Sequence, residues 1–395
     1  MKHKNRIHVV YIITKLELGG AQKVCLELFN GVQNADISSH LISGAQGTLV
    51  DAVKQNNQVI LLDNFKREIS FTAIFNELHC LWHLIKQLRS LKKVHPTMIV
   101  HTHSTKAGII GRWAAWCAGI KTRIHTIHGY GFHDHQSWLL WLPLYLLELM
   151  TSIITTHYIC VSSTDVATGT KLFPYFTRKY SLIRAAVDQH QFYIPARVTS
   201  LHESTMNTST VSTFTKNNFT FGTISCFKPQ KNLFDLLNAF ALVHQHNSHT
   251  RLEIIGDGIQ RRAIEQWITE HSLTKVITLH GWQAHVAPIM LTWDAFVLSS
   301  LWEGLPCAII EARIAKLPVL CYDTGGIKDI ILHEKNGLLY KQKDWHALAH
   351  GMRELTNNKN LYTQLHMYAD NLDAFKNSYM IQEHRALYTQ LTHTK

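Results

Sequence analysis

The chain has 395 residues, of which 46% are hydrophobic, and this is enough apolar material for two sizeable cores. Lys and Arg number 39 against 28 Asp and Glu, a formal charge of +11 that favours anionic ligands or surfaces. This composition excludes a disordered protein. Because no base-stacking or helix-turn-helix pattern accompanies the charge, we expect phosphorylated ligands and an anionic phospholipid surface as partners, and no nucleic acid.

Short apolar strands alternate with longer helical patterns in both halves of the chain, which is typical of βαβ units and parallel sheets. The strands predicted in the first half are 7–13, 39–42, 59–62, 98–101, 123–127, 158–161 and 180–183. Because the first strand begins almost at once and leads into a Gly-Gly turn, we expect no signal peptide. The cysteines are odd in number and form no Cys-x-x-Cys pair, so we expect reduced thiols in a cytoplasmic protein.

Two helical segments of the first half have more than one interpretation. The helix predicted over 71–93 collects cations near its end, where they either complement the helix dipole or form a membrane-facing patch. These cations are Lys86, Arg89, Lys92 and Lys93. The apolar segment 138–147 contains Pro143, is closed by Glu148 and is too short to span a bilayer. It is either a buried core helix or an interfacial helix, and the second interpretation makes the protein peripheral on the inner face of the cell membrane.

The second half repeats the alternation of strands and helices. Its predicted strands are 219–225, 251–255, 276–279, 295–298 and 319–322. The segment 195–218 is rich in Ser, Thr and Asn and poor in large apolar residues, so it is predicted to be a linker. The predicted domains are therefore 1–194 and 219–375, followed by a C-terminal helix over 376–395 that can pack back on the first domain.

The 27 histidines are spread along the chain without the spacing of a metal site. His101 and His103 flank a strand end, and His133 and His135 lie in a loop, but no Cys or carboxylate set completes four ligands there. We therefore expect no metal.

The Gly19-Gly20 turn separates the first strand from a helix predicted over 22–30. Glycines let backbone N–H groups approach an anion closely, at the positive end of the helix. The turn is thus a candidate anion site, with an ordinary tight loop as the alternative.

His128 follows the strand over 123–127 and precedes Gly129. Its ring and carbonyl are expected to project at the carboxyl end of the sheet, where open α/β sheets bind ligands. The alternative is a core histidine with satisfied hydrogen bonds.

Lys231 stands at the start of a helix predicted over 233–244. A lysine is misplaced beside a helix N-terminus unless an anion lies between them, which favours phosphate binding over a solvated charge. Further along, Gly256 and Gly258 flank Asp257 at the end of a strand, and a plain turn with positive φ is one interpretation.

Glu303 and Glu311 lie on either side of a junction between the strand over 295–298 and a helix over 306–315. Pro306 fits the first helical turn. Free helix N–H groups attract a diphosphate, while a carboxylate accepts hydrogen bonds from vicinal sugar hydroxyls. The junction therefore predicts capture of a sugar nucleotide, and the alternative is two solvated acids on an ordinary strand and helix.

In this order, over about residues 7–375, the motifs resemble the retaining nucleotide-sugar transferases of glycosyltransferase family 4, also called glycosyl transferases group 1. The segment 101–132 is similar to a subgroup that acts in bacterial surface polysaccharide synthesis. The resemblance implies an α/β protein of the GT-B fold, with two Rossmann-like domains facing each other across a cleft. It implies transfer of a sugar from a nucleotide-sugar donor to a glycan or polyprenyl-linked acceptor, with retention at the anomeric carbon.

The resemblance also assigns roles to residues. Glu303 contacts the transferred sugar, Glu311 holds the ribose, and His128 touches the sugar near the reacting centre. Lys231 binds the diphosphate and stabilises its charge as it leaves, so no metal or other cofactor is expected. The remaining donor contacts are the family's glycine turns and the residues that follow the first glutamate, which here are Gly19, Gly20, Gly256, Gly258, Gly304 and Leu305.

Three positions depart from the family pattern. Cys226 stands where an arginine binds the diphosphate, with Lys228 as a candidate replacement; Asp329 stands where a glutamate is usual; and 185–188 reads Ala-Ala-Val-Asp instead of Asn-Gly-Val-Asp. Two other functions therefore stay open, a GT-B nucleotide-sugar epimerase and a catalytically silent nucleotide-sugar-binding protein. The sequence identifies neither the base, the sugar nor the acceptor.

Overall fold

The computed structural model describes residues 6–65, 74–192 and 218–393, which form two compact units. Unit 1 comprises Met1–Ala186 and Ala374–Lys395, and unit 2 comprises Val187–Asp373. Apart from Asn218, the predicted linker lies outside the described residues. Unit 2 begins before that linker because the 3-10 helix η3 (Gln189–Phe192) packs against it, and Gln189 donates a hydrogen bond to the Leu372 carbonyl at 3.2 Å.

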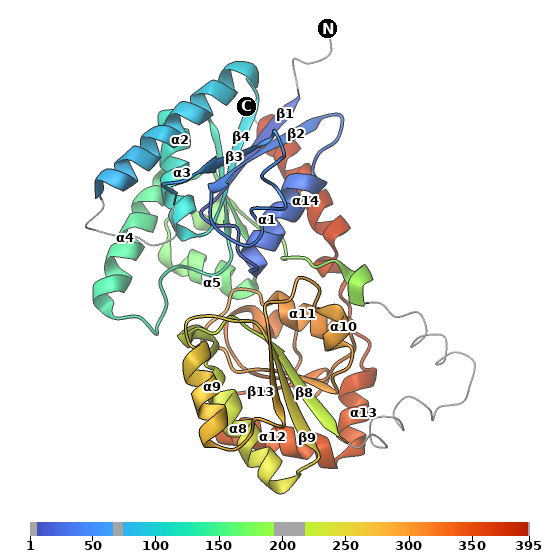
Figure 1. Ribbon diagram of the computed structural model, residues 1–395. Coiled ribbons are helices and arrows are strands. Elements are labelled where there is room, and N and C mark those ends of the chain that lie inside the picture. Colours follow the sequence, from blue (N-terminus) through green and yellow to red (C-terminus); the bar gives the residue numbers. More distant parts are fainter. Residues whose placement is uncertain (1–5, 66–73, 193–217, 394–395) are drawn as a thin grey trace. The chain divides into compact units, whose positions relative to one another are not determined.

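Unit 1 is built on a parallel sheet of seven strands in the order β3-β2-β1-β4-β5-β6-β7 (Figure 1). The strands are β1 (Ile7–Ile13), β2 (Ile37–Gly44), β3 (Val59–Leu62), β4 (Met98–His103), β5 (Thr122–Ile127), β6 (His157–Cys160) and β7 (Tyr180–Leu182). The central strands are buried on both faces, as expected for a parallel sheet covered by helices on both sides.

Helices cover both faces of this sheet (Figure 1). They are α1 (Gly20–Gly31), α2 (Ile74–Val94), α3 (Thr105–Cys117), α4 (Trp138–Ile154), α5 (Ser163–Leu172) and, from the end of the chain, α14 (Asn377–His393). Helices α2 and α3 enclose one core with β1 and β4, while α14 lies against α1 and β1. The predicted residues 71–73 of α2 lie outside the described residues.

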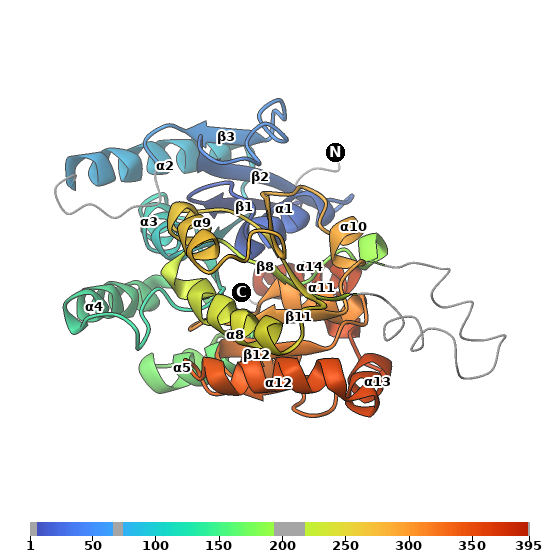
Figure 2. The same cartoon turned by 60° about the horizontal axis from the view of Figure 1, so that its bottom comes forward.

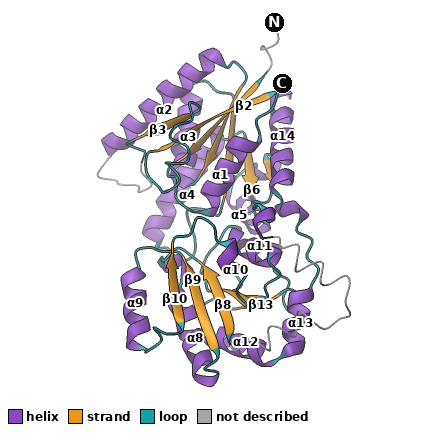
Figure 3. Cartoon of the chain, turned by 45° about the vertical axis from the view of Figure 1, so that its right-hand side comes forward, coloured by secondary structure: helices purple, strands orange, loops and turns teal. Residues whose placement is uncertain are grey.

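Unit 2 contains a second parallel sheet, in the order β10-β9-β8-β11-β12-β13. Figure 3 shows β10, β9 and β8 of this sheet side by side. Its strands are β8 (Phe219–Ile224), β9 (Thr250–Ile255), β10 (Ile277–Gly281), β11 (Ala295–Leu298), β12 (Val319–Tyr322) and β13 (Gly337–Tyr340). Its helices are α8 (Leu233–His246), α9 (Arg261–Glu270), α10 (Ala287–Met290), α11 (Cys307–Ile314), α12 (Trp345–Asn357) and α13 (Lys359–Met367). Strand β13 was not predicted.

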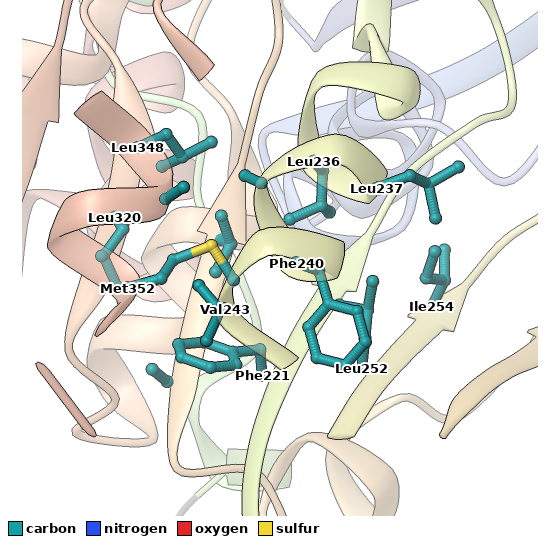
Figure 4. Packing of buried hydrophobic residues seen from close by; sticks show 14 of the residues in the cluster. Phe221, Leu236, Leu237, Phe240, Val243, Leu252, Ile254, Leu320, Leu348 and Met352 are labelled. Atoms are coloured by element: carbon teal, nitrogen blue, oxygen red, sulfur yellow. The ribbon is translucent and has the colours of Figure 1, made fainter. Parts of the chain in front are cut away.

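Figure 4 shows the core on one face of this sheet. Phe240 and Val243 of α8 and Met352 of α12 pack between the helices and the strands, over Phe221 and Leu252. These apolar contacts fix the position of α8 on the sheet, and with it the positions of the loops next to the helix.

Helix α4 extends beyond the apolar segment 138–147 and ends at Ile154. Glu148, which closes that segment, is buried in an ion pair with Arg112 of α3 at 2.6 Å. Of the two interpretations of the segment, the buried core helix does not hold, because Trp141 and Tyr145 pack inward while Trp138 is 70% exposed.

The expected α/β class with two Rossmann-like domains is confirmed. All seven cysteines are free. Among the described residues, no helix combines the length and the apolar character that a membrane span requires.

Candidate functional site

The strand order of unit 2 reverses between β8 and β11. These two strands are neighbours in the centre of the sheet, whereas β9 lies beyond β8 and β12 lies beyond β11. Open α/β sheets bind ligands at the carboxyl ends of the strands that flank such a reversal. The loops that follow β8 and β11 carry Lys231 and Glu303.

Lys231 and Glu303 form an ion pair, although 72 residues separate them in the chain. Lys231 ends the 3-10 helix η4 (Pro229–Lys231), and its Nζ donates to Oε1 of Glu303. Only 19% of the lysine side chain and 8% of the glutamate side chain are exposed. The sequence assigned the two groups to different parts of a ligand and did not predict this contact. The ammonium group of Lys231 can still bind an anionic ligand from its place beside the carboxylate.

Hydrogen bonds fix the backbone of both loops. Ser299 Oγ lies 3.1 and 2.9 Å from the carbonyl oxygens of Lys231 and Asn232 and donates its hydrogen there. The Leu301 amide donates to the Gln230 carbonyl at 2.8 Å. The position of the ion pair is thus determined by the main chain of both loops.

The Gly325-Gly326 turn after β12 supports the Glu303 loop. The Gly326 amide donates to the Gly304 carbonyl at 2.7 Å. Gly325 has φ 55°, and a Cβ added there would lie 2.0 Å from the Glu303 carbonyl oxygen. Only glycine tolerates both this dihedral and this close approach.

The Gly256-Asp257-Gly258 turn lies against the loop that leads to Lys231. Gly256 has φ 132°, and a Cβ added to it would meet the Ser225 carbonyl oxygen at 1.9 Å. The Phe227 amide donates to the Asp257 carbonyl at 2.9 Å. The turn therefore borders the loop after β8, and at Gly256 it also needs the positive φ expected of a plain turn.

Helix α11 holds Glu311, which is 6% exposed. The helix begins at Cys307, and Pro306 is its N-cap with φ −76° and ψ 105°. The prediction that Pro306 occupies the first helical turn was wrong, because its ψ is extended and it precedes the helix. Its ring offers no acceptor for the first N–H groups of the helix. Leu305, a predicted donor contact, is 8% exposed.

Two buried hydroxyls near this site were not singled out from the sequence. Ser225 follows β8 and Ser300 lies in the loop after β11, and neither Oγ has a hydrogen-bond partner among the described residues. Buried polar atoms without partners are rare in folded proteins. The sequence did contain one indication of these hydroxyls, because both serines follow a strand that flanks the reversal of strand order.

The strand order of unit 1 reverses between β1 and β4. After β1, Gly19 is the N-cap of α1 with an extended backbone, and it has no side chain that could cap the helix. After β4, Ser104 is the N-cap of α3 with φ 66°, and its Oγ lies 3.1 Å from Thr14 Oγ1. Non-glycine residues with a strained backbone cluster at functional sites. No local sequence pattern, however, predicts that a serine will have a positive φ. Gly20 is exposed at the start of α1.

His128 lies directly after β5 and is partly exposed. Its Nε2 is 2.9 Å from Nδ1 of His103, which is fully buried on β4. Burial, and then the charge of His384, lower the pKa of His128 to about 3. The ring is therefore neutral near pH 7 and acts through hydrogen bonds, because an imidazolium is not available there.

The neighbouring His101 is a satisfied core histidine. Its Nδ1 lies 2.7 Å from the Tyr388 hydroxyl of α14, and its Nε2 lies 2.6 Å from Thr126 Oγ1. The Tyr388 hydroxyl also lies 2.9 Å from that of Tyr11. This network ties the C-terminal helix to the sheet of unit 1.

A second group of histidines lies at the opposite ends of the strands of unit 1. Ring nitrogens of His8, His40 and His95 lie within 4.8 Å of one another. However, the rings of His8 and His95 stack at 3.7 Å with an angle of 6° between their planes. Since a bound metal lies close to the plane of each imidazole, two rings stacked in this way cannot share one ion, and we assign no metal to them.

Two family models match the chain. Glycosyltransferase Family 4 matches residues 18–191, and Glycosyl transferases group 1 matches residues 207–372. Together they contain every predicted site residue described above. The N-terminal match holds Gly19, Gly20 and His128, and the C-terminal match holds the two glutamates and Lys231.

Curated relatives and solved structures agree with the family models. The chain is 28% identical over 358 residues to an Escherichia coli UDP-Gal:alpha-D-GlcNAc-diphosphoundecaprenol alpha-1,3-galactosyltransferase, which covers 90% of this chain and 89% of the relative. It is 22% identical over 382 residues to the Staphylococcus aureus capsular polysaccharide biosynthesis glycosyltransferase CapM, over 91% of this chain and 90% of the relative. The structure of Anabaena Alr3699/HepE in complex with UDP and glucose matches with a TM-score of 0.78 at 16% identity, over 97% of this chain and 99% of that one.

Proposed function

Because the chain belongs to the glycosyltransferases of family 4, the glycosyl transferases group 1, and is a glycosyltransferase of the GT-B fold, we propose that it transfers a hexose from a UDP-sugar to a polyprenyl-diphosphate-linked acceptor in bacterial surface polysaccharide synthesis. The observation that carries the proposal is the Lys231–Glu303 ion pair at the strand-order reversal of unit 2. The pair supports the proposal because a cation suited to a diphosphate lies beside a carboxylate suited to sugar hydroxyls.

The choice of donor and acceptor is supported by two relatives. The name of the E. coli enzyme specifies a UDP-galactose donor and a diphosphoundecaprenol-linked acceptor, and its match spans nearly all of both chains. The Anabaena protein was solved with UDP and glucose. We therefore propose UDP as the nucleotide, with a galactose or glucose unit as the transferred sugar.

In the proposed donor complex, Lys231 and the N-terminal N–H groups of α11 bind the diphosphate. Negative charge grows on the diphosphate oxygens as the bond to the anomeric carbon breaks, and donors already aimed at those oxygens stabilise it. Because these groups supply the compensating charge, the step needs no metal. Glu303 orients the sugar hydroxyls, and Glu311 accepts hydrogen bonds from the ribose.

We propose that the reaction retains the anomeric configuration. The acceptor hydroxyl attacks the anomeric carbon from the face that the UDP leaves, and the departing diphosphate oxygen takes the hydroxyl proton. The C–O bond to the acceptor thus replaces the C–O bond to UDP, and the products are the glycosylated acceptor and UDP. His128 contacts the sugar through a hydrogen bond from its neutral ring.

The acceptor side is proposed to work at an anionic membrane surface, with the protein on the cytoplasmic face. Helices α2 and α4 both pack against α3 (Figures 1 and 2). All three helices expose apolar side chains. These side chains are Phe75, Leu78, Trp82 and Val94 of α2, Trp116 of α3, and Trp138, Leu139, Leu140, Leu142, Leu146, Leu147, Met150 and Ile153 of α4. We call this set the apolar helix face. Tryptophans beside leucines on a surface helix are typical of interfacial binding.

The cations of α2 divide between two roles. Arg89 donates to the Cys117 carbonyl at 3.1 Å, and Lys92 donates to the Gly119 carbonyl at 2.7 Å, so both cap the end of α3. Lys86 lies over the Trp82 ring at 5.4 Å. The proposed contact with anionic headgroups therefore falls chiefly to Lys86 and Lys93.

The test is a transfer assay with the full chain. UDP-galactose, UDP-glucose and their N-acetyl forms are each incubated with diphosphoundecaprenol-linked acceptors, and the products are analysed by NMR. We expect one donor to give a glycosylated acceptor with the anomeric configuration of that donor. An inverted product would overturn the retaining proposal. Release of UDP and a changed sugar without any acceptor would indicate the epimerase instead.

A further inference from the structure

The contact between His103 and His128 has a property that the proposed reaction does not explain. His103 is fully buried, its Nδ1 faces His128 Nε2 at 2.9 Å, and its own Nε2 has no hydrogen-bond partner among the described residues. Nδ1 of His128 makes no hydrogen bond to a described side chain or backbone group. The pair is thus a short relay with a buried end and a partly exposed end.

A neutral imidazole carries one proton, on either Nδ1 or Nε2, so a single hydrogen lies between the two rings. Either His103 Nδ1–H donates to His128 Nε2, or His128 Nε2–H donates to His103 Nδ1. Burial lowers the pKa of both rings, which keeps both of them neutral near pH 7. The two arrangements then differ in what they leave at each end.

The buried end decides between the arrangements. If His103 is the donor, its Nε2 is left as a lone pair without a partner. If His128 is the donor, His103 carries a proton on Nε2, and a buried N–H group is left without an acceptor. Buried N–H groups without an acceptor are rare in proteins, which favours the arrangement in which His103 is the donor.

We propose that His103 is a positioning residue that holds His128 with its proton on Nδ1, so that this nitrogen is a hydrogen-bond donor to an oxygen of the sugar substrate. The inference rests on the proposed function for the identity of that ligand. It assigns the sugar contact to a donor, whereas a lone pair on Nδ1 would serve a sugar hydroxyl only as an acceptor. Strand β4 supplies His103, and β5 leads to His128, so two neighbouring strands fix the relay.

The first experiment measures the tautomer without any substrate. The full chain is labelled with ¹⁵N-histidine, and protonated and unprotonated ring nitrogens are distinguished by their chemical shifts. Signals are assigned by their loss in His128→Gln and His103→Asn. We expect His128 Nδ1 to be protonated and its Nε2 unprotonated. A proton on His128 Nε2 would overturn the proposal, whether or not the protein transfers sugar.

The second experiment compares substitutions of His103 in the transfer assay. The side-chain amide of Asn overlies the Nδ1–H of His, so His103→Asn should keep most of the rate, whereas His103→Leu should lower kcat about tenfold, the equivalent of one net hydrogen bond. His157→Asn is the control, because a ring nitrogen of His157 also makes a hydrogen bond, to Ser181 Oγ at 2.9 Å, but His157 lies at the amino end of β6 and away from His128. Equal rates for the Asn and Leu variants would contradict a positioning role. Thermal unfolding of each variant separates loss of the hydrogen bond from loss of the fold.

Discussion

At the scale of single residues, the Lys231–Glu303 pair means that neither charge can be removed alone without consequence. We expect Lys231→Ala to lower turnover by roughly 10²- to 10³-fold, because it removes the cation beside the leaving diphosphate. The departure at Cys226 leaves no arginine at that position to compensate. Steady-state rates with the identified donor measure the effect, and a variant that works at full speed would exclude the phosphate role.

The same pair makes a prediction about stability. Each single variant, Lys231→Ala or Glu303→Ala, leaves a poorly exposed charge without its partner, whereas the double variant removes both charges. We expect the unfolding temperature of the double variant to fall by less than the falls of the two single variants added together. Thermal unfolding of the four proteins forms a double-mutant cycle. Additive effects would mean that the ion pair does not contribute to the fold.

Glu311 gives a prediction for binding. Glu311→Ala should weaken the binding of UDP by ~1–3 kcal/mol, because the ribose hydroxyls lose a carboxylate acceptor, while it disturbs folding far less. Calorimetric titration with UDP is the measurement. Glu270→Ala, on the exposed end of α9, is the matched control and should bind UDP as the wild type does. An unchanged dissociation constant for the Glu311 variant would move ribose recognition elsewhere.

At the scale of elements, the turn after β12 controls the loop that holds Glu303. Gly325→Ala introduces a side chain at φ 55° and places its Cβ 2.0 Å from the Glu303 carbonyl oxygen. We expect a displaced Glu303 and a large loss of kcat/KM. Gly281→Ala is a matched control, since Gly281 has φ 68° but an added Cβ would approach only Arg261, at 3.9 Å.

If the two glycine variants lose the same activity, backbone strain alone explains the effect, and the close approach to Glu303 does not matter. If only the Gly325 variant is impaired, the turn acts through the loop. Thermal unfolding of both variants shows whether the strain itself is similar.

Helix α4 carries the prediction on membrane binding. The full chain should co-sediment with vesicles that contain anionic lipids, and less so at high salt, because screening weakens the attraction of the basic residues. Leu139→Glu with Leu146→Glu should reduce this binding strongly. Ile259→Glu is the control, since Ile259 is 81% exposed but lies in unit 2, outside the apolar helix face. Equal recovery with and without vesicles would exclude the membrane contact.

Individual elements show how far the sequence determines the fold. The bounds of β1, β3, β11 and β12 agree with prediction, because each is a compact apolar run bounded by polar or turn residues. Strand β13 was missed because Gly337–Tyr340 is short and begins with glycine, and only its pairing with β12 makes it a strand. The apolar segment 138–147 did not reveal that α4 continues past Glu148, because the glutamate is neutralised by Arg112, which is distant in sequence.

The candidate site was predictable to the same extent. Position after a strand identified Lys231, Glu303 and His128, since the carboxyl ends of parallel strands meet at one edge. The ion pair and the relay to His103 depend on which strands are neighbours, and a single sequence does not reveal strand order. The positive φ of Ser104 likewise results from tertiary packing and has no local signal.

At the scale of the whole molecule, burial lowers the pKa of a set of histidines in unit 1. They are His8, His40, His95, His101, His103, His125, His128, His133, His157 and His384. In the unfolded chain these rings titrate near 6.5, so the unfolded state binds more protons below that pH. The stability contributed by their neutral, folded forms is complete above pH 6.5 and is lost as the pH falls toward the folded values, about 4 for His157 and His384.

We therefore expect unit 1 to lose stability on acidification from pH 7 to 5, by about 1.4 kcal/mol per pH unit for each proton taken up on unfolding. Hydrogen exchange read by mass spectrometry follows unit 1 separately. The variant His157→Gln should reduce the pH dependence by one proton. A stability of unit 1 that is constant or rises over this range would contradict the assignment of buried neutral histidines.

The helix α14 has a consequence for how the protein is made. The hydroxyl of Tyr388 completes the buried contacts of Tyr11 and His101, and Arg385 donates to the Gly31 carbonyl at 2.7 Å. These partners precede unit 2 in the chain, whereas the helix follows it. During translation unit 2 can fold as soon as Asp373 has left the ribosome, but unit 1 must wait for α14 with part of a sheet face uncovered over β1 and with Tyr11 and His101 lacking the Tyr388 hydroxyl. Unit 1, whose first residues precede unit 2 in the chain, is thus the unit that finishes folding last. Its uncovered apolar surface is the surface that a chaperone would have to shield during that time.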